Sequence, residues 1–274
     1  MRILVLGQSD SEGGFIADRS LAWPWLLEAE LPALVGEPVE VGHRRLWGDG
    51  ARALAHLEAQ LAEHRPDFVV LMASSSGFAL RTVANRLRQL FGRRVGRWAH
   101  RRQEAIGGRA REAGRMQRMA IRVAQRAARR IIGVAGAIPP EVALATYASL
   151  IRRLAREEQL PVVIMGGGGY GQEFHRLNRG MASVIEETRS AIREVALSCH
   201  FAWIDQEAAL EAAGDRESFY GPDGVHRTVE GHRAVHDALL PLAAEIWLAG
   251  RVRSPLAPAK AMAPAAKERV TPPA

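Results

Sequence analysis

Short apolar runs, each ending at a glycine or a polar residue, recur along this chain of 274 residues and alternate with helical stretches. Continuous runs of this kind are typical of parallel strands that helices cover on both faces. Five runs are predicted to be strands: Ile3–Leu6, the weaker Val39–Val41, Phe68–Met72, Val162–Met165 and Phe201–Ile204. Apolar residues at helical spacing predict four helices: Ala51–Glu63, Pro140–Glu158, Ala182–Leu197 and Gly231–Leu248.

The alternation of strands and helices predicts an α/β fold. Five strands suit a flavodoxin-like three-layer sandwich, in which a five-stranded parallel sheet carries helices on both faces. Ligands of such sheets bind at the carboxyl ends of the strands, so we expect functional residues directly after strands. We expect residues 1–250 to form this domain, and residues 251–274, rich in proline, alanine and lysine, to be a disordered tail.

Composition is that of a globular protein, with 47% hydrophobic and 24% charged residues. Cys199 is the one cysteine, so no internal disulfide can form and nothing points to an oxidising compartment. The apolar run at the N-terminus is too short for a signal peptide, and no later run approaches the roughly 18 residues that a spanning helix needs. We therefore expect a cytoplasmic protein without a transmembrane segment.

Basic charge is concentrated in residues 81–131, which hold sixteen arginines, no lysine and two glutamates, a net charge of +14 in a chain of net charge +7. This insert is predicted to form one or two arginine-rich helices with a break at Gly107-Gly108. Three interpretations stay open: a solvated helical hairpin, a lid or docking surface for an anionic substrate, lipid surface or protein, and a nucleic-acid site. Nucleic acid is the least favoured, because no helix-turn-helix, zinc or RNA-recognition motif is present.

Ser9 follows the first predicted strand directly, where a side chain lies at the mouth of the sheet. Taken alone, a serine there is better explained as a helix N-cap. In the last predicted turn Asp223 precedes His226 by three residues, so that the carboxylate can orient the imidazole as a general base. His232 and His236 follow on a helix, where solvent or the edge of the core is the expected environment.

Two alternatives to this chemistry concern metals and phosphates. A metal site from His226, His232 and His236 is disfavoured, because no cluster of acidic or cysteine ligands accompanies them. The glycine-rich run at residues 166–171 lacks the Lys-Ser/Thr of a phosphate-binding loop and the spacing of a dinucleotide fingerprint. We interpret it as a loop lining the edge of the site, and expect neither cofactor nor metal.

Together the two turns match a known family. The segment GQSDSEG at residues 7–13 resembles the first block of SGNH/GDSL hydrolases, and GPDGVHRTVEGH at residues 221–232 resembles their last block. The resemblance implies that Ser9 is the nucleophile and that Asp223 and His226 complete its triad. It further implies a serine ester hydrolase that forms a covalent acyl-enzyme on small or short-acyl esters.

The resemblance also suggests oxyanion donors. Gly48, in the turn at residues 46–50, is similar in position to the glycine of the second block. The asparagine of the third block is absent, and Ser76 is the best positional match, with Ser75 close behind. This departure keeps one alternative open, a catalytically weak or inactive protein that binds a ligand. The basic insert keeps open a second, a scaffold that docks on an anionic surface through residues 81–131.

Three further positions depart from the family pattern or place charge near the site. Gln8 replaces the aspartate of the first block, which is not the catalytic acid. Asp10 and Glu12 add negative charge, which would disfavour an oxyanion, so we expect both side chains to point away from the site. Arg227 replaces the usual proline after the histidine, and we expect this change to matter little to the chemistry.

Overall fold

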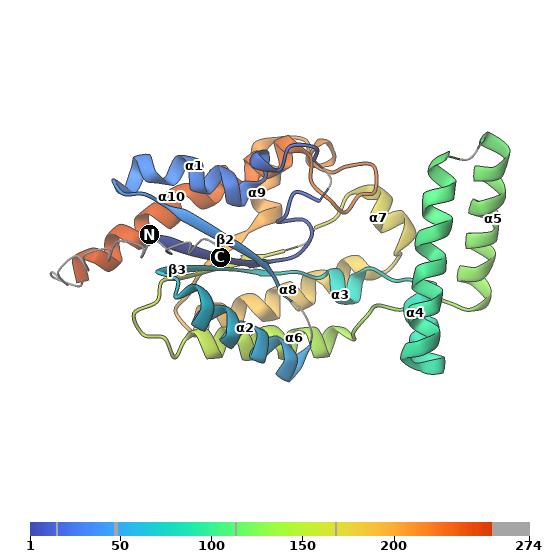
Figure 1. Ribbon diagram of the computed structural model, residues 1–274, viewed down its shortest axis with the longest axis horizontal. Helices are drawn as coiled ribbons and strands as arrows, with labels where there is room; N and C mark the ends of the chain where they lie inside the picture. Colours follow the sequence, from blue (N-terminus) through green and yellow to red (C-terminus); the bar gives the residue numbers. More distant parts are fainter. Residues whose placement is uncertain (15, 47–48, 113, 168, 254–274) are drawn as a thin grey trace, which may run out of the picture.

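Five parallel strands form one sheet in a computed structural model that describes residues 1–14, 16–46, 49–112, 114–167 and 169–253 (Figure 1). The strand order is β2-β1-β3-β4-β5, the flavodoxin-like order. The register places Leu6 of β1 beside Arg44 of β2 and Leu71 of β3. The strands are β1 (Arg2–Gly7), β2 (Glu40–Arg45), β3 (Phe68–Ala73), β4 (Val162–Gly166) and β5 (Ala202–Asp205). The predicted fold class is confirmed.

The second strand lies later in the chain than its apolar run indicates. Val39–Val41 was the expected segment, but β2 continues through Gly42 to Arg45. Because β2 is an edge strand, its residues are only half-buried and charged side chains are tolerated along it. The apolar signal of a buried strand is therefore weak here.

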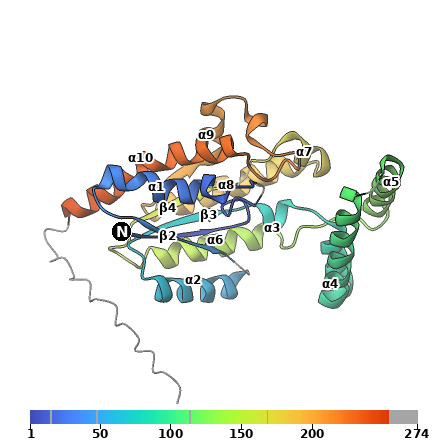
Figure 2. The same cartoon turned by 45° about the horizontal axis from the view of Figure 1, so that its top comes forward.

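Helices cover both faces of the sheet, as Figures 1 and 2 show. The contacts between helices define the two layers: α1 packs on α10 in one, whereas α6 packs on both α2 and α8 in the other. The layer helices are α1 (Trp23–Val35), α2 (Gly50–His64), α6 (Pro140–Leu154), α8 (Met181–Ser198), α9 (Gln206–Ala213) and α10 (Val229–Arg253). The shorter elements are the 3₁₀ turns η1 (Arg19–Leu21) and η2 (Arg216–Phe219), and the helices α3 (Ser76–Ala79) and α7 (Gln172–Leu177).

Alternate residues of β1 serve two separate cores. Ile3 and Val5 pack with α1 and α10 on one face, and Leu4 and Leu6 pack with α2 and α6 on the other. All four are at most 2% exposed. Burial on both faces explains why the strand is a continuous apolar run rather than an alternating one.

The basic insert forms a helical hairpin that stands away from the sheet, at the end where β3 leaves it (Figure 1). Its helices α4 (Val83–Glu112) and α5 (Arg115–Ile131) pack mainly on each other. The predicted break at Gly107-Gly108 is wrong, because α4 continues through both glycines. A glycine costs a helix only about 1 kcal/mol, which neighbouring turns can absorb. The interruption falls instead at Gly92, whose φ of 82° requires a glycine.

A short β-bridge fastens the hairpin to the domain. Thr82 and Ala135 exchange two backbone hydrogen bonds, of 2.9 and 3.1 Å. The Arg129 guanidinium also donates to the carbonyl oxygen of Leu177 at the end of α7. The segment that enters the hairpin and the segment that leaves it therefore lie side by side.

The C-terminal boundary differs slightly from the expected one. Helix α10 extends to Arg253, beyond residue 250, and the rest of the expected tail lies outside the described residues. Across the described ranges, no helix combines the length and apolarity that crossing a bilayer requires.

Candidate active site

Ser9 lies in a tight turn directly after β1, not at the start of a helix. The turn is closed by backbone hydrogen bonds from Gly13 to Asp10 and from Gly14 to Ser9. Gly14 has to be small, because a Cβ there would lie 2.8 Å from the carbonyl oxygen of Ser9. The helix N-cap interpretation of Ser9 therefore does not hold.

A second serine holds this turn against the edge strand. The Ser11 hydroxyl donates to the carbonyl oxygen of Gln8 at 2.8 Å and lies 2.8 Å from Nε2 of His43 on β2. Burial lowers the pKa of His43 to about 4 despite the nearby Glu12 carboxylate, so its ring is neutral at neutral pH. Gln8 itself donates from its side chain to the carbonyl oxygen of Leu46. These contacts fix where the chain emerges from β1.

The loop between η2 and α10 carries the other two residues predicted for the site. One carboxylate oxygen of Asp223 accepts hydrogen bonds from the backbone N–H groups of Val225 and His226, at 2.9 and 3.0 Å. Gly224 has a φ of 64°, and its carbonyl oxygen accepts a hydrogen bond from Gly171. The loop is thereby a compact turn that directs both side chains to one side.

The structure brings the three residues into one chain of hydrogen-bonding distances. Ser9 Oγ lies 3.1 Å from His226 Nε2, and His226 Nδ1 lies 2.7 Å from the second carboxylate oxygen of Asp223. Burial opposes ionisation of Asp223, but its hydrogen bonds from the His226 ring and from two backbone N–H groups outweigh burial and lower the pKa. The carboxylate is therefore ionised and holds Nδ1–H, which leaves Nε2 to accept from the serine hydroxyl.

Asp10 points into the interior of the protein rather than into solvent. It is 8% exposed, forms an ion pair with the Arg227 guanidinium, and accepts a hydrogen bond from the Arg227 backbone N–H at 3.2 Å. Burial lowers the pKa of Arg227 to about 10, so the guanidinium stays charged at neutral pH. The negative charge of Asp10, the residue after Ser9, is thus compensated by Arg227. Glu12, by contrast, pairs with Arg45 on β2.

Arg227 matters more than its place in the motif suggests. Its side chain is 2% exposed and also donates to the side-chain oxygen of Gln206. Because Asp10 follows Ser9 and Arg227 follows His226, this ion pair joins the two turns of the candidate site across 217 residues of sequence. No feature of the sequence identified the pair, since it depends on two side chains meeting in the interior.

The two histidines after the motif are also more buried than expected. His232 and His236 are 1% and 0% exposed, so the expectation of solvent or the edge of the core is wrong for both. Burial, together with nearby Arg227 and His226, lowers the pKa of His232 to about 3. Among the described residues no group of three or more His, Cys, Asp or Glu side chains is arranged to bind a metal ion.

Two of the three candidate oxyanion donors lie among the described residues. Gly48 lies outside the described residues. Ser76 begins α3, where its hydroxyl accepts a hydrogen bond from Ser74 at 3.0 Å. The Ser75 hydroxyl is turned to the buried hydroxyl of Tyr170, 3.1 Å away, and so serves packing. Within the described ranges the Ser9 backbone N–H donates to no other group of the chain.

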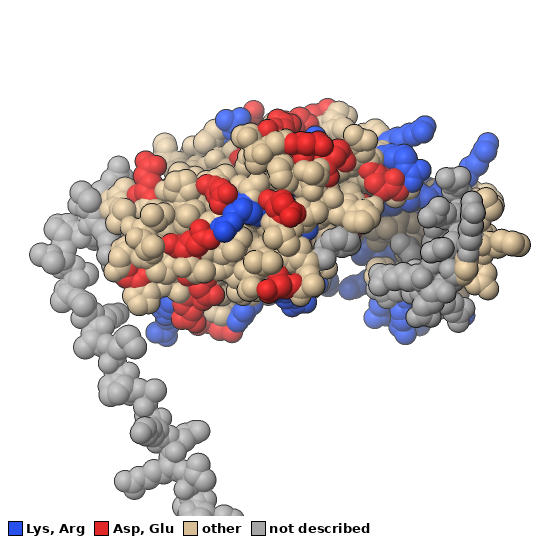
Figure 3. Space-filling view, turned by 90° about the horizontal axis from the view of Figure 1, so that it is seen from above, with Lys and Arg blue, Asp and Glu red and all other residues tan. Residues whose placement is uncertain are grey.

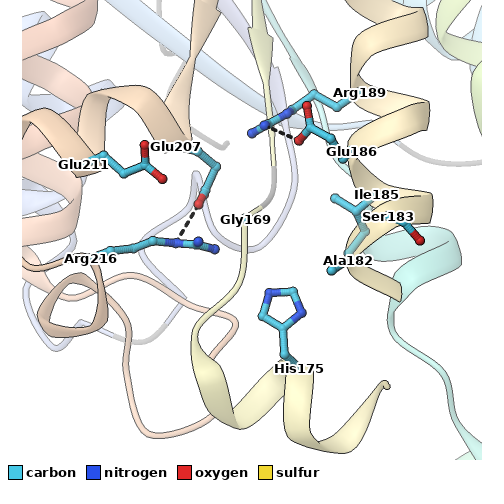
Figure 4. Close-up of a pocket in the computed structure, with 10 residues that line it drawn as sticks. All are labelled: Gly169, His175, Ala182, Ser183, Ile185, Glu186, Arg189, Glu207, Glu211 and Arg216. Atoms are coloured by element: carbon cyan, nitrogen blue, oxygen red, sulfur yellow. Dashed lines mark hydrogen bonds and ion pairs between the residues drawn. The ribbon is translucent and has the colours of Figure 1, made fainter. Parts of the chain in front are cut away.

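A cavity of about 390 Å³ lies between α7, α8 and α9 (Figure 4). Its charged side chains are turned toward one another: Arg216 lies 2.8 Å from Glu207, and Arg189 pairs with Glu186. The Tyr220 hydroxyl lies 2.7 Å from both Glu207 and the carbonyl oxygen of Gly169. Tyr220, at the start of the loop between η2 and α10, thus contacts this ion-paired cluster, and neither Ser9 nor His226 lines the cavity.

Comparison with known proteins gives structural matches only. No family model matches the chain, and no curated protein matches it in sequence. The lipase/acylhydrolase from Enterococcus faecalis superposes with a TM-score of 0.56 at 16% identity, covering 89% of this chain and 96% of its own. TesA gives 0.52 at 19% identity, covering 90% and 99%. A catalytic mutant of the acetylxylan esterase Axe2 from Geobacillus stearothermophilus gives 0.53 at 17%, covering 88% and 92%.

These matches span nearly the whole of each matched structure, so the likeness concerns a complete domain rather than a shared motif. At such low identity they establish architecture alone. The order of the strands and the placing of the first and last sequence blocks agree with that architecture. The chain therefore shares the fold of these solved structures.

Proposed function

We propose that this chain is a serine ester hydrolase in which Ser9 is the nucleophile, His226 the general base and acid, and Asp223 the residue that orients the histidine. The observation that carries the proposal is the pair of distances, 3.1 Å from Ser9 to His226 and 2.7 Å from His226 to Asp223. An ionised carboxylate, a histidine and a serine in this order are the three parts of an activated nucleophile. The names of the structural relatives, an acylhydrolase and an esterase among them, agree with ester substrates.

The reaction follows from the roles of the three side chains. Nε2 of His226 takes the proton of Ser9 as Oγ forms a bond to the ester carbonyl carbon. The tetrahedral intermediate collapses when the bond to the alkoxy oxygen breaks and His226 returns the proton to the leaving alcohol. Water, deprotonated by His226, then attacks the acyl-enzyme, and the carboxylic acid leaves as Ser9 regains its proton.

Stabilisation of the oxyanion is assigned to backbone N–H groups. The Ser9 N–H, which donates to no other group of the described chain, is the first donor, and Gly48 is proposed as the second from its place in the sequence. Ser76 is proposed as an auxiliary donor through its hydroxyl. Each donor of this kind contributes about 2.7–4 kcal/mol to lowering a barrier, so loss of the family asparagine slows the reaction without abolishing it.

The openness of the site favours small substrates. The side chains of His226 and Asp223 are 25% and 40% exposed. A long acyl chain would gain little burial there, whereas an acetyl or other short acyl group needs little. We therefore propose small or short-acyl esters as the substrates.

Hydrolysis of p-nitrophenyl esters of increasing acyl length tests this proposal. We expect kcat/KM for the acetate to exceed that for the decanoate by at least about tenfold, because the exposed side chains of His226 and Asp223 give added methylenes little surface against which to be buried. Ser9→Ala should reduce every rate to background, and Ser190→Ala on α8 is the matched control that should leave the rates unchanged. Equal rates in the wild type and Ser9→Ala would instead indicate a ligand-binding protein with a hydrolase fold.

A further inference from the structure

The helical hairpin α4–α5 exposes large apolar side chains that no part of the described chain covers. On α5 the side chains of Met116, Met119 and Val123 are 85%, 68% and 60% exposed, and Ile131 is 83% exposed. These positions follow one another at intervals of three, four and eight residues, which places them on one face of a helix. An apolar face of this size on a surface helix indicates that something binds there.

Positive charge is concentrated on the same helix. Helix α5 contains six arginines and no acidic residue. Helix α5 therefore combines an exposed apolar face with a high density of positive charge in its sequence.

Helix α4 adds exposed aromatic side chains to the same hairpin. Phe91 and Trp98 are 64% and 58% exposed. The guanidinium of Arg102 lies over the Trp98 ring, 5.9 Å from its centroid. Aromatic rings next to cations are typical of segments that lie at the boundary between lipid headgroups and acyl chains.

Charge on the rest of the molecule has the opposite sign. Basic side chains gather over the hairpin, and acidic ones spread over the body (Figure 3). The insert carries a net charge of +14 and the whole chain one of +7, so the remainder of the chain is acidic, with a net charge of −7. A negatively charged surface therefore attracts the hairpin and repels the body, which orients the molecule on it.

We propose that the α4–α5 hairpin docks this protein on an anionic lipid bilayer, with the apolar face of α5 in the headgroup region and the arginines on lipid phosphates. A bilayer uses both the apolar face and the positive charge of α5, whereas a nucleic acid would use the charge and leave the apolar face in water. A second copy of the chain would bring two hairpins of +14 together, which like-charge repulsion opposes.

The hairpin is well placed for such a role. It leaves the domain after β3, at the carboxyl end of the sheet (Figure 1). Ser9 follows the carboxyl end of β1, and His226 lies 3.1 Å from the Ser9 hydroxyl. The bridge between Thr82 and Ala135 fixes its base to the domain. Docking therefore turns the end of the sheet that holds the candidate active site toward the bilayer. Binding itself does not depend on the proposed catalysis.

Co-sedimentation of the full chain with vesicles tests this proposal. We expect binding to vesicles of phosphatidylglycerol mixed with phosphatidylcholine, weakening as salt is raised, and no binding to phosphatidylcholine alone. Met119→Glu with Val123→Glu should weaken binding by at least about tenfold, because two apolar side chains are lost from the headgroup region. Both positions are exposed, so melting temperature should be unchanged.

The matched control is Leu34→Glu with Leu197→Glu, which makes the same change of charge at two side chains on α1 and α8 that are each 49% exposed. It should bind vesicles as the wild type does. Ser9→Ala should also bind normally, which separates docking from the proposed hydrolysis.

Several results would overturn the proposal. Absence of binding to the anionic vesicles is one, and equal weakening by the two double variants is another, because charge alone would then explain the binding. Binding to a DNA duplex without binding to vesicles would assign the hairpin to nucleic acid. Light scattering that shows a dimer lost in Met119→Glu with Val123→Glu would assign its apolar face to self-association.

Discussion

Asp223→Asn is expected to lower kcat for ester hydrolysis by about four orders of magnitude while the protein stays folded. Asparagine keeps the side-chain oxygen that accepts from the backbone N–H groups of Val225 and His226, so the turn is retained. Its NH₂ group, however, replaces the carboxylate oxygen 2.7 Å from Nδ1 of His226. An NH₂ group donates to Nδ1 and moves the ring proton to Nε2, which can then no longer accept from Ser9.

Steady-state kinetics with p-nitrophenyl acetate measures this effect. Asp215→Asn is the matched control, because Asp215 similarly accepts from a backbone N–H, that of Glu217, at the start of η2, and is not part of the candidate site. Its kcat should equal that of the wild type. A value of kcat for Asp223→Asn within about tenfold of the wild type would remove Asp223 from the proposed mechanism.

Arg227→Met is expected to lower the free energy of unfolding by about 3–5 kcal/mol. Methionine fills much of the space but leaves the Asp10 carboxylate, 8% exposed, without its buried counter-charge. The loss of a partner costs far more than an ion pair contributes, because the remaining charge stays out of water. Denaturant unfolding monitored by circular dichroism measures the change.

Two further variants identify the cause. Arg233→Met removes an arginine whose side chain is 48% exposed and pairs with Glu30, and should cost less than about 1 kcal/mol. Adding Asp10→Asn to Arg227→Met should restore part of the lost stability, since the buried charge is then gone. A double variant as unstable as the sum of its two single variants would contradict the assigned ion pair.

The sheet could be predicted from sequence because its inner strands are buried on both sides. Leu4, Leu6, Val70 and Leu71 face helices whichever way they point, so their strands are plain apolar runs. The signal fails at β2, where one edge is open and charged residues replace apolar ones. Helix α1 was not predicted at all: Pro24 and Pro32 obscure it, although the first stands at the helix start, where proline is tolerated.

The residues of the candidate site also differ in whether the local sequence could predict them. Ser9, Asp223 and His226 lie in local turns whose sequence is distinctive, so their positions could be predicted. The ion pair of Asp10 and Arg227 could not, because each residue is ordinary in its own turn and only packing brings them together. The burial of His232 escaped prediction for the same reason, since exposure depends on elements distant in sequence.

The central claim is that Ser9 is an activated nucleophile, and reaction with a fluorophosphonate probe tests it most directly. The Ser9 oxygen would displace fluoride from phosphorus, and peptide mass spectrometry would locate the adduct. The account predicts labelling of the wild type at Ser9, at the segment of residues 7–13, and none of Ser9→Ala. Equal labelling of both proteins, or no labelling of a folded wild type, would contradict it.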